Sequence, residues 1–200
     1  MGTEVSAKAV MELRELSGAG VMDCKKALAE AGGDMDAALR LLREQGIKVA
    51  GKKAVREASE GLVLSYIHGE GRLGVLVEVN CETDFVARTD DFRDFCKKVA
   101  MQIAAKEPLA VRREDIPVEV VEEEKNIYRA QLRDSGKPAN IVDRIVDGKL
   151  EKFYEESCLL DQAWIHDESS GSVKDVQTGV IARLGENVVI RRFSRFELGR

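Results

Sequence analysis

The chain has 200 residues, a formal net charge of −5 and 34% charged residues. This length fits one mid-sized domain or two small ones, and it allows roughly 70% of the unfolded surface to be buried. With only 5% aromatic residues and a mildly acidic balance, the sequence lacks the basic stripe and the stacking platforms that nucleic-acid binders use. We therefore expect no nucleic-acid partner.

Membrane and secretion signals are also missing from the pattern. No apolar run approaches the ~20 residues that span a bilayer, and the first ten residues lack a basic region followed by an apolar stretch. The cysteines are Cys24, Cys81, Cys96 and Cys158. They form no C-x-x-C pair, which favours buried thiols in a reducing compartment. We expect a cytoplasmic protein with no membrane contact and no metal site.

The first fifty residues predict three short helices around a small apolar core. The expected inward residues are Ala9, Val10, Leu13 and Leu16, then Cys24, Ala27, Leu28 and Ala31, and finally Met35, Ala38, Leu39 and Leu42. Gly32-Gly33 ends the second helix, Asp34 caps the third and Gly46 ends it. Residues 48–60 are basic and are predicted to form a helical linker. Small three-helix modules of this kind usually bind other proteins.

From Gly61 onward the apolar period changes to two, which predicts a β-hairpin with a turn at 68–71. A helix follows over about 90–106, with Phe92, Phe95, Val99 and Ile103 at core spacing. Further helices are expected from about 119 to 133, from about 138 to 154 and from 173 to 184. A strand over 188–196 closes the chain.

Two glycine-rich segments approach nucleotide-binding motifs without satisfying them. Gly46 to Lys53 nearly spells a phosphate-binding loop, but it lacks the hydroxyl residue after the lysine and a preceding strand. A small nucleotide hydrolase built on this loop is the alternative function. Gly69 to Gly74 fits G-x-G-x-x-G, yet it opens a strand, whereas the dinucleotide motif opens a helix. We find no convincing acid, base or nucleophile, and expect a non-enzymatic protein without catalytic residues.

The stretch after the hairpin stands out. Thr83 and Asp84 are both good N-caps, so a helix should begin there and place Phe85 in its first turn. Phe85 either staples the helix to the hairpin as a core residue or serves as an anchor that fills a partner's pocket. The residue pattern alone favours the core role.

Three segments resemble signatures of the translation elongation factor Ts family: 80–88, 18–28 and 185–193. They occur in the family's order and span nearly the whole chain. The resemblance implies an α+β fold, in which a three-helix module similar to ubiquitin-associated domains precedes a core with a small antiparallel sheet packed by helices. It divides the chain into this module (1–47), the linker (48–60) and the core (61–200), which also serves dimerisation.

Members of this family release GDP from elongation factor Tu, the GTPase that carries aminoacyl-tRNA to the ribosome. By resemblance, the chain would be a guanine-nucleotide exchange factor that needs no cofactor. One segment would enter Tu near its nucleotide and dislodge Mg²⁺: Thr83, Asp84, Phe85 and Val86. A second segment would meet Tu's G domain: Val21, Met22, Asp23 and Cys24. A ubiquitin-type adaptor that uses only the first module would leave the matched core unexplained.

The chain departs from many family members, which are longer. It is expected to have room neither for a second core subdomain nor for a coiled-coil insertion. Short members pair two chains through their sheets, and the final strand fits that role because both its faces mix apolar residues with Arg191, Arg192 and Arg195. We therefore expect a homodimer. Ser194 stands where some short relatives have a cysteine, so that position offers no covalent link.

Overall fold

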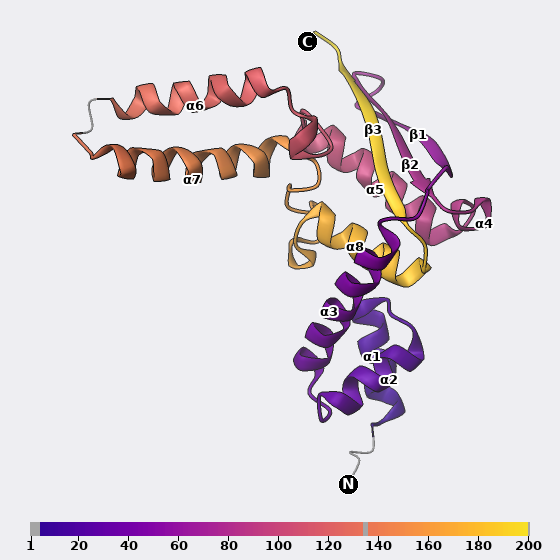
Figure 1. Cartoon of the computed structure of the whole chain (residues 1–200). Coiled ribbons are helices and arrows are strands. Elements are labelled where there is room, and N and C mark those ends of the chain that lie inside the picture. The colour runs from indigo at the N-terminus through magenta and orange to yellow at the C-terminus, as the bar shows by residue number, and fades with distance from the viewer. Residues whose placement is uncertain (1–4, 134–135, 200) are drawn as a thin grey trace. The chain divides into compact units, whose positions relative to one another are not determined.

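The structure, a computed structural model, describes residues 5–133 and 136–199 (Figure 1). Its α-helices are α1 (Ala7–Ser17), α2 (Val21–Glu30), α3 (Met35–Lys53), α4 (Asp84–Ala87), α5 (Asp90–Lys106), α6 (Val118–Leu132), α7 (Ala139–Ser157) and α8 (Val173–Leu184). Its strands are β1 (Glu60–His68), β2 (Leu73–Cys81) and β3 (Val188–Glu197). Short 3₁₀ turns lie at Arg113–Asp115 and Glu168–Ser170. None of the described helices combines the length and the hydropathy that a bilayer span requires.

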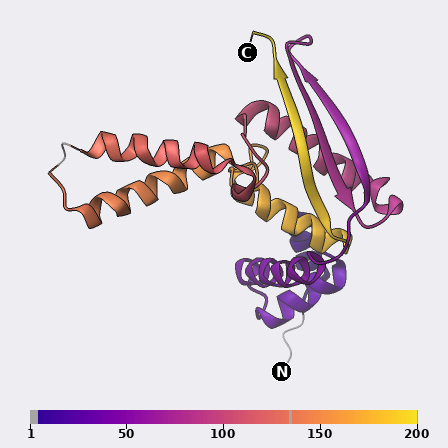
Figure 2. The same cartoon turned by 45° about the horizontal axis from the view of Figure 1, so that its top comes forward.

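The strands form one antiparallel sheet in the order β1-β2-β3 (Figure 2). The predicted hairpin is confirmed, and its turn contains Gly69 and Gly71 with φ of 58° and 88°. Glycine favours this left-handed region because it has no Cβ. The G-x-G-x-x-G segment therefore forms the hairpin turn and the start of β2. Together with the surrounding helices, the sheet confirms the predicted α+β class.

Residue contacts divide the described chain into two compact units. The first contains residues 5–62, 80–95 and 177–189, and the second contains residues 63–79, 96–133, 136–176 and 190–199. The first four residues of the predicted 1–47 module lie outside the described residues.

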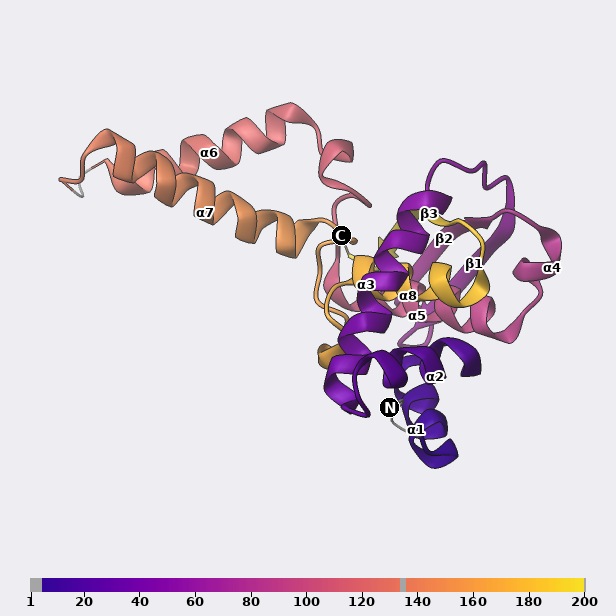
Figure 3. The ribbon, with the colours of Figure 1, turned by 60° about the horizontal axis from the view of Figure 1, so that its bottom comes forward.

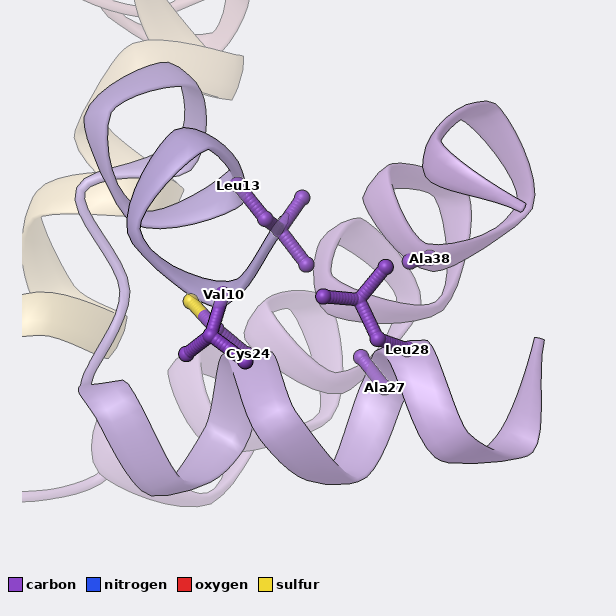
Figure 4. Packing of buried hydrophobic residues seen from close by; sticks show 6 residues of the cluster. All are labelled: Val10, Leu13, Cys24, Ala27, Leu28 and Ala38. Atoms are coloured by element: carbon purple, nitrogen blue, oxygen red, sulfur yellow. The ribbon is translucent and has the colours of Figure 1, made fainter. Parts of the chain in front are cut away.

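In the first unit, α1, α2 and α3 pack around a small apolar core (Figures 3 and 4). Its buried members are Val10, Leu13, Cys24, Ala27, Leu28 and Ala38. Asp34 caps α3 by accepting a hydrogen bond from the Ala37 amide at 2.8 Å, as predicted. The expectation for Leu16 is wrong, since 63% of its surface is exposed. The inward position one turn after Leu13 is held instead by the half-buried Ser17, whose hydroxyl donates to the Leu13 carbonyl.

The prediction that Gly46 ends the third helix is also wrong. Helix α3 continues through Gly46 to Lys53, so the first half of the predicted 48–60 linker belongs to the same helix. Gly46 is buried, and a Cβ at this position would lie 3.5 Å from the Ala182 Cβ of α8. This distance is an ordinary van der Waals contact, so Gly46 packs against α8 in the interior of the helix and does not stop it. A continuous helix over 46–53 also rules out the phosphate-binding loop, which needs a strand leading into a loop.

In the second unit, α6 and α7 pack against each other as an antiparallel pair (Figure 1). The expectation that the chain has no room for such a helical insertion is therefore wrong. Val146 and Leu150 of α7 are buried, and the Lys149 ammonium lies 5.2 Å from the centre of the Tyr128 ring of α6. The sequence predicts each helix by itself, but pairing depends on which faces meet, and the start and stop signals of a helix leave that open.

A pair of buried amides joins the end of α5 to the segment after α7, within the second unit. Gln102 donates to the Gln162 side chain at 3.1 Å, and Gln162 donates to the carbonyls of Lys106 and Glu156 at 3.2 and 2.7 Å. Because these carbonyls lie at the C-terminal ends of α5 and α7, one side chain supplies donors to both helix ends. The base of the α6–α7 pair is thereby fixed.

Helix α5 confirms the predicted core spacing, because Phe92, Phe95, Val99 and Ile103 are all buried. The first backbone amides of this helix need a capping acceptor. Thr89 performs that role, since its hydroxyl accepts a hydrogen bond from the Phe92 amide at 3.3 Å. Asp90 and Asp91 lie in the first turn, where their charge complements the helix dipole.

Strand β3 is an edge strand, as its mixed composition predicted. Val188 and Ile190 are buried, but both Arg191 and Arg192 are exposed, and alternate residues are half-buried from Phe193 onward. The inward and outward sides therefore exchange at the two arginines, as they do at a one-residue bulge. This exchange explains why the sequence of the strand mixes apolar and charged residues on both faces.

Candidate functional site

The turn after β2 leads into the one-turn helix α4, and we call residues 83–86 the tip. Thr83 is extended, with φ −130° and ψ 153°, and its hydroxyl accepts a hydrogen bond from the Val86 amide at 3.3 Å. The predicted N-cap is thus confirmed at Thr83. Asp84 begins the helix, and its carboxylate lies 2.7 Å from the Arg88 guanidinium. This ion pair is largely solvated and contributes little to stability.

Phe85 lies on the outer side of the tip, with 77% of its surface exposed. The core role that the residue pattern favoured is wrong. Residues two apart on a helix point roughly 200° away from each other, so Ala87 takes the buried position and Phe85 faces solvent. An exposed aromatic side chain on a backbone held by hydrogen bonds is a candidate anchor for a partner's pocket.

Two carboxylates from distant parts of the sequence hold the base of the tip, and we call this arrangement the Glu82–Glu186 clamp. Glu186 accepts hydrogen bonds from the amides of Glu82 and Thr83 at 3.1 and 3.0 Å, and from the Thr83 hydroxyl at 2.7 Å. In return, the Glu82 carboxylate accepts from the Asn187 amide at 2.7 Å. The buried Asn187 side chain donates to the Arg56 carbonyl at 2.8 Å, which joins a third segment to the clamp.

No residue pattern assigns a role to Glu82, Glu186 or Asn187, although all three lie in the segments that resemble the family. The one indication in the sequence is their chemistry. Backbone amides at the ends of strands need hydrogen-bond acceptors, and acidic or amide side chains can supply them. The separation of 104 residues between Glu82 and Glu186 leaves no local pattern that pairs them.

The clamp predicts a pH dependence of stability. The Asn187 amide, and after it the Arg56 guanidinium, hold the pKa of Glu82 below its ordinary value of 4.5, with partial burial opposing them. A carboxylate whose pKa is lowered by folding stabilises the protein above its unfolded pKa, and this contribution is lost as the pH falls through the lower, folded pKa. We expect the free energy of unfolding to fall over this acidic range.

The measurement is denaturant unfolding as a function of pH for the wild type and Glu82→Gln. The variant should show a smaller decrease in the free energy of unfolding through the carboxylate range, because its amide does not titrate. Glu57→Gln, at an exposed position before β1, serves as the control and should follow the wild type. An unchanged pH dependence in Glu82→Gln would show that Glu82 titrates normally.

Cys81 lies directly behind the tip. Its side chain is fully buried, and its sulfur donates a hydrogen bond to the Thr83 carbonyl at 3.1 Å. Burial, and after it the nearby negative charge of Glu186, raises the pKa of the Cys81 thiol to about 11. At neutral pH this cysteine is therefore a protonated thiol that supports the tip, not a nucleophile.

The second predicted site, Val21 to Cys24, forms the start of α2. Val21 and Met22 are 43% and 73% exposed, and Asp23 is exposed as well. Cys24 is fully buried in the three-helix core, with its sulfur 3.7 Å from the Ala19 carbonyl. The first three residues can thus meet a partner directly, while Cys24 holds the helix that presents them.

Helix α8 reaches the flanks of both predicted sites within the first unit. The Arg183 guanidinium lies 3.2 Å from Asp91, just beyond the tip. A Cβ on Gly18, in the loop before α2, would lie 2.9 Å from the same guanidinium. One arginine therefore bridges the segment before Val21 and the segment after Val86.

Comparison with known proteins places these features in a family. The profile described as "Elongation factor TS" matches residues 8–176. Elongation factor Ts of Caldanaerobacter subterraneus subsp. tengcongensis is 61% identical, over 98% of this chain and 97% of its own length. The proteins of the same name from Fervidobacterium nodosum and Thermotoga maritima are each 54% identical over 98% of this chain, and over 99% and 97% of their own lengths. The chain therefore belongs to the elongation factor Ts family of translation factors.

Proposed function

We propose that the chain binds elongation factor Tu carrying GDP, displaces the Mg²⁺ at its nucleotide site and promotes release of GDP, so that GTP can bind. The exposed Phe85 carries this proposal. A large aromatic side chain on a backbone fixed by hydrogen bonds suits insertion into a partner's pocket, because little conformational freedom is lost on binding. The resemblance of residues 80–88 to the family signature supports elongation factor Tu as the partner.

In this proposal the tip acts without covalent chemistry. Phe85 wedges between helices of Tu and Asp84 enters near the nucleotide, which displaces the elements that hold Mg²⁺. An exchange factor must bind nucleotide-free Tu more tightly than the GDP-bound form, and by linkage GDP and GTP then weaken its own binding. Each 1.4 kcal/mol of differential affinity changes the equilibrium about tenfold, so a few such increments weaken the binding of GDP to Tu by orders of magnitude while the factor is bound.

Val21, Met22 and Asp23 form the proposed second contact, with the G domain of Tu. Met22 suits this role because its long thioether side chain is flexible and polarizable and 73% of its surface is exposed. We assign this contact to a ubiquitin-associated-like module over 1–47, joined through 48–60 to a core over 61–200. The whole process belongs in the cytoplasm and requires no nucleic acid, metal or cofactor bound by this chain.

The test is the release of labelled GDP from purified elongation factor Tu in the presence of excess unlabelled nucleotide. Added chain should accelerate release in a concentration-dependent and saturable way, and excess Mg²⁺ should oppose it. An unchanged release rate would contradict the proposal. A parallel binding measurement of nucleotide to the isolated chain should show no binding, whereas the alternative hydrolase requires it.

We also propose that two copies pair through the outer face of the sheet in the second unit. Exposed apolar residues gather on this face from all three strands: Val63, Ile67, Leu76 and Phe196, between 49% and 73% exposed. Arg192 and Glu78 form an ion pair of 2.6 Å beside them. An apolar patch with a polar rim is typical of a protein interface.

We expect Leu76→Glu to convert the dimer into a monomer. Two facing copies of the patch would then bury an unpaired carboxylate from each chain, which is strongly unfavourable. Gel filtration with light scattering measures the molar mass of both proteins. Val55→Glu adds the same charge at a residue with 89% exposure in the other unit, and it should leave the dimer intact. A monomeric wild type would overturn the pairing.

A further inference from the structure

The orientation of the tip is not explained by the tip's own residues. A helix of four residues has no stability of its own, because helix nucleation is unfavourable until several turns have formed. The exposed Phe85 side chain buries little apolar surface that would hold it in place. The orientation of the tip must therefore come from the segments that contact its backbone.

Glu186 supplies the contacts that precede the tip. One of its carboxylate oxygens accepts from the amides of both Glu82 and Thr83, and the other accepts from the Thr83 hydroxyl. Hydrogen bonds to a carboxylate are shorter and stronger than those between neutral groups. The three donors converge on one side chain, which fixes the backbone at two successive residues.

The Thr83 hydroxyl transmits this constraint into the helix. It donates to Glu186 at 2.7 Å and accepts from the Val86 amide at 3.3 Å. Because a hydroxyl has a single proton, donation to Glu186 leaves its oxygen lone pairs directed at the first turn of α4. Glu186 thus orients the cap that begins the helix carrying Phe85.

We propose that Glu186 is a positioning residue for nucleotide exchange: it fixes the tip before the partner arrives, so that Phe85 is presented in its binding orientation. The inference rests on the exchange function proposed above. Glu186 itself does not need to touch the partner. Its effect is preorganisation, which reduces the freedom that the tip would otherwise lose on binding.

Substitutions at Glu186 separate geometry from charge. Glu186→Gln keeps the length of the side chain: its carbonyl can accept from both amides and its NH₂ can donate to the Thr83 hydroxyl, which leaves neutral and weaker bonds. Glu186→Asp keeps the charge but is shorter by one carbon–carbon bond, about 1.5 Å, so its carboxylate falls short of the three donors. Glu186→Ala removes both charge and bonds.

The experiment measures two quantities for each variant in the full chain. Hydrogen exchange of the Glu82 and Thr83 amides, in the factor alone, reports whether the clamp holds. The rate of labelled GDP release from Tu, at concentrations of factor below saturation, reports whether the clamp matters for exchange. Glu57→Ala removes the same charge at an exposed position and serves as the matched control.

We expect Glu186→Ala and Glu186→Asp to lower amide protection and the release rate by at least about tenfold, which is 1.4 kcal/mol. Glu186→Gln should retain most of both, and Glu57→Ala should match the wild type. If Glu186→Ala fails to fold, the comparison of the other two variants still tests the inference, because Glu186→Gln should keep higher amide protection and a higher release rate than Glu186→Asp. Retention by Asp and loss by Gln would assign the effect to charge and overturn the inference. Lowered protection with unchanged release, or unchanged protection, would also overturn it.

Failure of the underlying function gives a different result. If the wild type does not accelerate GDP release at all, the proposed function is wrong and the positioning role for exchange falls with it. If the wild type is active and Glu186→Ala equals it, only the positioning role is wrong.

Discussion

Phe85→Ala should slow Tu-bound GDP release at least about tenfold, a loss of 1.4 kcal/mol or more, while the protein stays folded. Truncation of an aromatic anchor at the centre of an interface commonly costs 2 kcal/mol or more of binding free energy. The same side chain contributes little to folding, because 77% of its surface is already exposed in the free protein. The variant should therefore separate activity from stability.

The release assay and denaturant unfolding together check this prediction. Val55→Ala serves as the control: Val55 is 89% exposed, in the same unit as the tip but before β1, and its loss should affect neither measurement. If Phe85→Ala unfolds the protein, the aromatic ring supports the fold after all. If both the release rate and the stability stay at the wild-type level, the tip is not the site that triggers release.

Phe92→Ala should lower the stability of the fold and leave the release rate per folded molecule unchanged, the opposite of Phe85→Ala. Phe92 lies seven positions after Phe85 but is among the largest fully buried side chains of the described residues. Replacing a buried phenylalanine by alanine removes transfer free energy and leaves a cavity, at a cost of about 3–5 kcal/mol. We expect a corresponding decrease in the free energy of unfolding, because the surrounding residues can only partly close the space.

The unfolding curve and the release rate per folded molecule test this second prediction. The free energy of unfolding should fall by several times the change seen in Phe85→Ala. Under conditions where Phe92→Ala remains folded, its specific release rate should stay near that of the wild type. A stability change below about 1 kcal/mol, within the usual range for surface substitutions, would mean that the position is not packed as described.

The two phenylalanines also show how far the sequence predicts this fold. Phe92 belongs to a 17-residue helix whose apolar residues repeat with helical spacing, and such long, strongly periodic segments are predicted well. Phe85 lies in a four-residue helix, where one turn is too short to show a period. The orientation of Phe85 follows from Thr83 as the cap and Ala87 as the buried residue. Which side of this single turn faces the core is evident only in the folded structure.

Other differences between the predicted and the observed structure also come from tertiary contacts. Glycine is common just after the end of a helix, but Gly46 lies inside one, where it packs against Ala182, more than 130 residues later. The pairing of α6 with α7 and the bonds from Glu186 to the tip likewise depend on residues that meet only in the folded chain. The resemblance placed the chain in its family, which the comparisons confirm, but it did not reveal the residues that hold the tip.

Helix α3 runs unbroken from Met35 to Lys53, so the first part of the connection out of the three-helix core is helical, and a non-helical stretch over 54–59 then leads to β1. Each residue inserted into or deleted from this helix would rotate the segments at its two ends by about 100° and shift them by about 1.5 Å. The solvent-facing side chains between Ile47 and Lys53 can therefore be substituted with little effect, whereas a change in the number of residues in this stretch would be disruptive. Mutational drift in this stretch should take the form of substitutions, with insertions and deletions selected against.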